Sequence, residues 1–275
     1  MNALKKSIIA GSWYPGNPSI LKRDIENYFN SVSSPELKGE VVGLISPHAG
    51  YMYSGQIAAH AYNLIRGKKY DVVIVVGPSH RVAFHGVSVF SRGGYETPLG
   101  IVPVDEGLAE EIKKISPIVA DFPGAHLQEH SVEIQLPFLQ IALGDFLFLP
   151  LVMGDQDVNT CQELAEAIHK ASRGKKILIV GSSDLSHFYN YNVAKKMDAI
   201  ALDYLKNGDA IGLLKSLENG EVEACGGGPM AVSILVARMM KAKKAYLLKY
   251  ANSGDVTRDK NSVVGYASAV YCRES

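Results

Sequence analysis

The chain has 275 residues, enough to bury the core of one large α/β domain, and its 28 basic and 28 acidic side chains leave no net charge. This balance, without a long basic run, argues against nucleic acid as a partner, and the longest apolar runs fall well short of the roughly 20 residues that cross a bilayer. Three widely spaced cysteines do not predict a disulfide framework, and the short apolar patch near the N-terminus does not predict a secretory signal, so we expect a cytoplasmic protein that is not bound to a membrane.

The first part of the chain predicts buried strands that run directly into histidine-containing loops. Continuous apolar runs with β-branched residues favour strands buried on both faces, and small residues after the first loop favour a helix packed closely on the sheet. The expected elements are a helix over Ile20–Phe29, a strand over Val41–Ile45, a helix over Ser54–Ile65 and a strand over Asp71–Val76.

The rest of the chain continues this alternation, and its strand, helix, strand order predicts parallel pairing within one domain that spans residues 1–275. The expected elements are strands Val87–Phe90 and Ile101–Val104 around a Gly-Gly-Tyr-Glu-Thr-Pro turn, a helix Val104–Ile115, a loop Asp121–Gln128, a helix Glu129–Leu143, a strand Phe146–Met153, a helix Val158–Ser172, a strand Ile177–Val180, helices Val193–Leu205, Ala210–Leu217 and Met230–Lys241, and strands Ala245–Tyr250 and Val263–Tyr271 separated by a polar loop Asn252–Asn261.

Three of the buried strands are followed by serine and histidine. The three stretches are LISPHAGYMYSG at 44–55, VVIVVGPSH at 72–80 and ILIVGSSDLSH at 177–187. In an open α/β sheet, ligands bind beyond the carboxyl ends of the strands, so these stretches predict one shared site. We expect a metal or acid/base cluster built from His48, His80 and His187.

Asp184 and His187 are three residues apart in the turn that follows the third of these strands. If the turn is helical, both side chains project the same way. A carboxylate that fixes the imidazole tautomer suits a general base or a partner of metal-bound water.

Cys225 precedes three glycines and a proline that open a predicted helix. It is either a buried structural cysteine or a functional thiolate, whose pKa the helix dipole would lower, and the glycine run favours function. Two histidines and a thiolate can bind one divalent cation with an open position. Cys161 and Cys272 have no such setting, and we expect them to be structural.

Two further residues are candidates for the walls of a cleft. Trp13, the only tryptophan, either anchors the N-terminal segment on the core or walls a pocket. His130 lies between Glu129 and Glu133 at the start of a predicted helix. The two carboxylates either complement the helix dipole or, with His130, belong to the surroundings of a metal.

Six motifs in order along nearly the whole chain resemble the Memo family, whose bacterial and archaeal members are also called AmmeMemoRadiSam system protein B. They are GSWYPG at 11–16, SPHAGYMYSG at 46–55, VGPSH at 76–80, EHSVEIQLPFL at 129–139, SSDLSH at 182–187 and CGGGP at 225–229. The resemblance implies a fold similar to the class III non-haem iron extradiol dioxygenases, an α/β sandwich around a largely parallel sheet flanked by helices.

The resemblance also implies that His48, His80 and Cys225 are metal ligands. Asp184, His187 and Trp13 would then line the same cleft. The dioxygenases bind iron through two histidines and one carboxylate, so a thiolate in the third position departs from them. A thiolate favours copper or zinc more than a carboxylate does.

The leading hypothesis is a metal-dependent oxidoreductase related to these dioxygenases. It would bind iron or copper, with zinc as an alternative. His187, oriented by Asp184, would move protons. A second hypothesis is a module that binds a peptide or small molecule in the same cleft without chemistry, as implied by the animal relatives, which are regarded as signalling adaptors. A third is metal-assisted hydrolysis with His187 as the base. The family name implies a pathway link to a radical SAM protein, and the sequence names no substrate.

Overall fold

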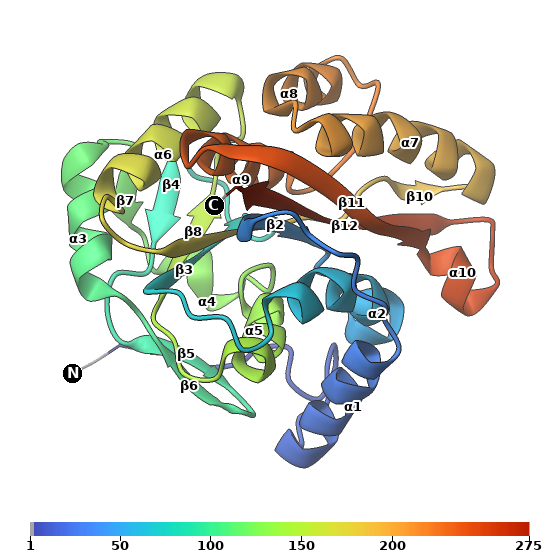
Figure 1. Cartoon of the computed structure of the whole chain (residues 1–275), viewed down its shortest axis with the longest axis horizontal. Helices are drawn as coiled ribbons and strands as arrows, with labels where there is room; N and C mark the ends of the chain where they lie inside the picture. Colours follow the sequence, from blue (N-terminus) through green and yellow to red (C-terminus); the bar gives the residue numbers. More distant parts are fainter. Residues whose placement is uncertain (1–2, 275) are drawn as a thin grey trace.

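The computed structural model describes residues 3–274, and its centre is a nine-stranded sheet with helices on both faces (Figure 1). The strand order is β10-β12-β2-β9-β3-β8-β4-β7, with β11 also paired to β12. The four middle strands pair in parallel: β2 (Glu40–Ser46), β9 (Ile177–Ser182), β3 (Val72–Pro78) and β8 (Phe148–Met153). This confirms the expected α/β fold with flanking helices, similar to the class III extradiol dioxygenases. The sheet is parallel at its centre, whereas the pairings of β10, β11 and β2 with β12 and of β4 with β8 are antiparallel.

The middle strands are buried on both faces, and alternate residues serve two different cores. In β3, Val73 and Val75 pack on one side of the sheet, whereas Val72, Ile74 and Val76 pack on the other. The first side is covered by α1 (Pro18–Asn30), α2 (Tyr51–Tyr62) and α5 (Leu136–Leu143), and the second by α3 (Glu106–Ile115), α6 (Val158–Ala171), α7 (Tyr191–Asn207), α8 (Ala210–Glu218) and α9 (Gly227–Met239) (Figure 1).

The turn expected between the strands at 87–90 and 101–104 is wrong, because most of its residues form a strand. This strand, β5 (Gly94–Thr97), forms a small sheet with β6 (Gly100–Pro103) and β1 (Leu4–Lys5). Its Tyr95 is almost fully buried. The strand β4 (Val87–Val89) instead joins the large sheet, antiparallel to β8 and parallel to β7 (Val119–Asp121).

The region 121–143 also differs from the expectation. The expected loop contains the end of β7 and a short helix, α4 (Gly124–Leu127). The helix expected from Glu129 begins only with a 3-10 turn at Glu133–Gln135, followed by α5. Pro137 explains this start, because proline lacks an N–H and fits only the first turn of a helix. Residues 129–132 are therefore free to turn toward the sheet edge.

The C-terminal part forms a long antiparallel pair of strands, β11 (Ala242–Asn252) and β12 (Val263–Arg273). The polar loop expected between them contains a short helix, α10 (Ser253–Thr257), and the strand β10 (His187–Tyr189) pairs with β12. Two expected helices begin three residues early, at Tyr51 rather than Ser54 and at Gly227 rather than Met230. Within residues 3–274, none of the helices combines the length and the apolar character needed to cross a membrane.

Candidate metal centre

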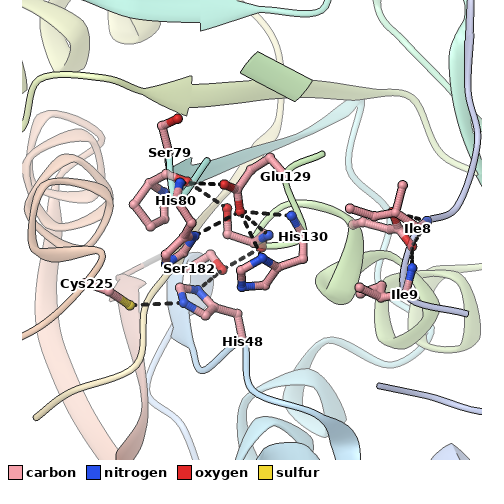
Figure 2. A network of polar contacts seen from close by, with 12 residues as sticks. Ile8, Ile9, His48, Ser79, His80, Glu129, His130, Ser182 and Cys225 are labelled. Atoms are coloured by element: carbon pink, nitrogen blue, oxygen red, sulfur yellow. Dashed lines mark hydrogen bonds and ion pairs between the residues drawn. The ribbon is translucent and has the colours of Figure 1, made fainter. Parts of the chain in front are cut away.

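Three side chains from distant parts of the chain converge at the carboxyl edge of the parallel strands. His48 follows β2, His80 follows β3, and Cys225 lies just before α9. One ligand atom from each of the three residues lies within 4.8 Å of the other two. Figure 2 shows Cys225 pointing at the His48 ring, and its Sγ lies 3.0 Å from Nε2 of His48. The parallel register of β2, β9 and β3 brings these loops to one edge.

The hydroxyl of Ser182, at the end of β9, fixes the ring of His48. It donates its hydrogen to the carbonyl oxygen of Ser131 at 2.7 Å and accepts from Nε2 of Gln135 at 2.8 Å. Nδ1 of His48, 3.0 Å away, must therefore donate to the same oxygen. This assigns the tautomer of His48 and leaves the lone pair of Nε2 directed to the cluster.

The carboxylate of Glu129 fixes the ring of His80 in the same way. Its Oε1 lies 3.0 Å from Nδ1 of His80, and its Oε2 accepts from the His80 backbone N–H at 2.7 Å. Although burial alone would raise it, the bonds and charge of His80 lower the pKa of Glu129 to about 2. Glu129 is thus an ionised acceptor that leaves Nε2 of His80 available. Of the two alternatives for Glu129, the role at a helix dipole is wrong, because no helix begins there.

His48 and His130 are held in the neutral form. Burial, with smaller contributions from His130 and His80, lowers the pKa of His48 well below its usual range. Burial lowers the pKa of His130 to about 4, and its ring stacks on that of His80 with the centroids 4.5 Å apart. Neutral imidazole is the form that binds a metal, so these histidines need not lose a proton first.

Cys225 is positioned by a close approach between two backbone segments. A Cβ placed on Gly226 would lie 2.2 Å from the carbonyl oxygen of Ser182, so only glycine fits after Cys225. Burial, followed by the charge of Asp184, raises the pKa of the Cys225 thiol. The expected lowering by the helix dipole is wrong, because Cys225 lies before the N-cap residue of α9 and is largely removed from water.

Asp184 and His187 lie in the same cleft but do not form the expected pair. The turn between β9 and β10 is not helical, and Oδ1 of Asp184 accepts the backbone N–H of His48 at 2.8 Å and that of Ala49 at 3.3 Å. Nδ1 of His187 lies 3.5 Å from a carboxylate oxygen of Glu223 instead. Asp184 therefore holds the His48 loop, and burial lowers the pKa of His187, with Glu223 opposing this.

Six of the candidate residues line a cleft of about 590 Å³, and Cys225 is not among the described residues that line it. Trp13 lies against His130 with the ring centroids 4.4 Å apart. The cleft is lined by the candidates Trp13, His48, His80, His130, Asp184 and His187, and also by Ser12, Met52, Tyr53 and Tyr266. No lysine or arginine is among the described residues that line it.

Sequence reasoning missed the roles of Ser182, Gln135 and Glu223. Ser182 belongs to the serine-histidine pattern at the strand ends, and this pattern could have indicated its place in the site. Gln135 and Glu223 have no such signal, because their partners are 47 and 36 residues away in the chain. Glu129 lies beside His130 in the sequence, but its contact with His80 joins residues 49 positions apart.

Comparisons with known proteins agree with the motifs. A sequence model of the family described as "Memo-like protein" matches residues 5–270. Relatives described as "MEMO1 family protein" include one from Methanobrevibacter smithii, which is 38% identical over 98% of this chain and 99% of its own length. Another, from Sulfolobus acidocaldarius, is 39% identical over 94% of this chain and 96% of its own length. The chain therefore belongs to the Memo family.

Proposed function

We propose that this protein binds one iron or copper ion through His48, His80 and Cys225 and acts as an oxidoreductase on a small molecule held in the cleft. The observation that carries the proposal is the convergence of three ligand atoms within 4.8 Å, with the second ring nitrogen of each histidine already engaged by the protein. Such engagement is typical of metal-ligating histidines.

The donor set fits a transition metal. Two neutral imidazoles and a thiolate suit iron, copper or zinc, and three protein ligands leave a coordination position for a substrate or water. A bound metal would offset the raised pKa of the thiol, because a coordinating thiol is deprotonated. When bound, iron or copper would supply one-electron redox chemistry at that open position.

The surrounding residues would serve this reaction by binding, orientation and proton transfer. Asp184 holds the loop that carries His48, and the rings of Trp13 and His130 pack together in one wall of the cleft, where they would orient a bound molecule. His187 lines the cleft, and its lowered pKa favours the neutral imidazole that can accept a proton. Its ring lies beside Glu223, which would stabilise the protonated form.

We place this activity in the cytoplasm and link it to a reaction of a radical SAM protein. All three cysteines are free, and two of them are buried away from the cluster, which suits a reducing compartment. A reducing compartment also keeps the Cys225 thiol available for a metal.

Anaerobic purification with metal analysis and oxygen-uptake measurements tests the proposal. We expect iron or copper in the wild type, loss of the ion in His48→Ala, and oxygen uptake that depends on the ion. Zinc with oxygen-independent turnover would favour metal-assisted hydrolysis instead. Ligand binding that survives the loss of both the metal and Cys225 would favour a binding module. Absence of a redox metal, unchanged by His48→Ala, would refute the proposal.

A further inference from the structure

A buried carboxylate close to the metal centre has all its hydrogen-bond partners on one remote segment. The N-terminal strap, which we define as residues 5–14, supplies every hydrogen bond that the Glu133 carboxylate makes within the described chain. Glu133 and Lys5 are both almost completely buried, and Nζ of Lys5 lies 2.7 Å from Oε2 of Glu133. A buried charge needs partners of this kind, and here they come from a segment more than 100 residues away.

The other carboxylate oxygen accepts hydrogen bonds from the middle and the end of the strap. Oε1 of Glu133 accepts from Oγ of Ser7 at 2.6 Å, from the hydroxyl of Tyr14 at 2.8 Å and from the backbone N–H of Ile9 at 3.3 Å. Burial and the charge of Glu133 raise the pKa of Tyr14, so its hydroxyl keeps the proton that it donates. The carboxylate thus closes residues 5–14 into a loop.

This loop carries Trp13 to the cleft. The backbone N–H of Trp13 donates to the carbonyl oxygen of Ile9 at 3.0 Å, and its own carbonyl accepts from the N–H of Tyr51 at 2.8 Å. Its ring then lies 4.4 Å from that of His130, three residues before Glu133. Glu133 accepts hydrogen bonds from Ser7 and Ile9 before Trp13 and from Tyr14 after it. The backbone of Trp13 is therefore held on both sides.

We propose that Glu133 is the positioning residue of Trp13, and that the Lys5–Glu133 pair latches the strap as one wall of the cleft. A buried ion pair adds little net stability compared with apolar residues of similar size, and its best-attested use is to specify one arrangement. The inference deepens the proposed function, on which it rests for the role of the cleft. The effect of this ion pair on the position of Trp13 can be measured without turnover.

The test uses the fluorescence of Trp13, the only tryptophan of the chain. The double variant Lys5→Met/Glu133→Gln removes both charges of the pair. We expect red-shifted emission and an acrylamide quenching constant raised about threefold, since a released segment exposes its side chains. Amide hydrogen exchange should accelerate at Ile8 and Ile9 but not in β2. The matched control Lys175→Met/Asp105→Asn removes another ion pair, of 2.7 Å, and should change none of these signals.

Metal binding separates this inference from the proposed function. Cobalt(II) added to the metal-free wild type should quench Trp13, and the double variant should bind the same one equivalent with the quenching largely lost. If cobalt does not bind the wild type, the proposed function fails, while acrylamide quenching still decides on the latch.

Unchanged Trp13 emission, acrylamide quenching and exchange in the folded double variant would overturn the inference. Should that variant fail to fold, Ser7→Ala/Tyr14→Phe carries the test, because it keeps the ion pair and removes both hydroxyl donors to Glu133 within the described chain. The same changes are expected there to a smaller extent, and their absence would equally overturn the inference.

Discussion

Sγ of Cys225 lies 3.0 Å from Nε2 of His48, although 177 residues separate them in the chain. Ser182 links the two sides of this contact, since its hydroxyl accepts from the His48 ring and its carbonyl oxygen presses against Gly226. The position of the thiol therefore depends on the end of β9 as well as on the start of α9, which follows it. A metal placed between these atoms would replace the direct contact.

Cys225→Ser should weaken metal binding by more than about 100-fold, because it removes a ligand, whereas changes to outer partners of ligands cost roughly 10- to 100-fold. Competition titration with a chelator of known affinity measures this. Cys161→Ser is the control, because Cys161 is buried in α6 and contacts the carbonyl oxygen of Gln156. Equal affinity of wild type and Cys225→Ser would remove Cys225 from the ligand set.

Glu129→Gln should lower metal affinity by roughly 10- to 100-fold, because the amide no longer supports the His80 ring with a charge. The same titration measures the effect. Glu163→Gln is the control, since Glu163 in α6 accepts a hydrogen bond from Ser116 at 2.6 Å and does not line the cleft. An effect of similar size in both variants would show that Glu129 acts only through general stability.

Gly226→Ala should lower the free energy of unfolding by about 1–3 kcal/mol and also weaken metal binding, since the added Cβ meets a backbone oxygen that cannot rotate away. Chemical denaturation and metal titration measure the two effects. Gly107→Ala in α3 serves as the control, because its Cβ would meet nothing closer than 3.5 Å and alanine favours a helix. A neutral Gly226→Ala would contradict the close approach.

His126 should contribute to acid unfolding. It is buried, its Nδ1 lies 2.6 Å from the hydroxyl of Tyr95 and its Nε2 lies 2.9 Å from Oγ of Ser88, and burial lowers its pKa to about 3. Between that value and about 6.5 the unfolded chain binds one more proton, so the free energy of unfolding falls as the pH falls, by about 1.4 kcal/mol per pH unit for this group.

The variant His126→Gln isolates this contribution from those of His48 and His130, whose pKa values are lowered as well. Denaturation curves between pH 4 and 7 should show a shallower slope in the variant. The same substitution at His85, whose side chain is fully exposed, should leave the wild-type slope. A slope in His126→Gln as steep as in the wild type would contradict a neutral, buried His126.

The parallel centre of the fold follows from the sequence because its strands are continuous apolar runs, as in β2, β3 and β9. The smaller elements do not. β7 has three residues and only its first is buried, and β5 begins at a Gly-Gly pair that favours a turn although Tyr95 fills the core. In both cases tertiary packing, which the local pattern does not contain, decides the structure.

The candidate site shows the same limit. His48, His80 and His187 follow from the rule that ligands gather at strand ends. The partner of Asp184 does not, because it is the backbone of a residue 136 positions away, and a carboxylate three residues from a histidine suggests the wrong pair. The pKa of Cys225 depends on burial by segments that only the fold brings together.

Anomalous diffraction at the metal absorption edge, from crystals of protein prepared without added chelator, locates a bound ion directly. We expect a single peak in contact with His48, His80 and Cys225. A peak elsewhere, or no peak in protein to which iron and copper were supplied, would contradict it.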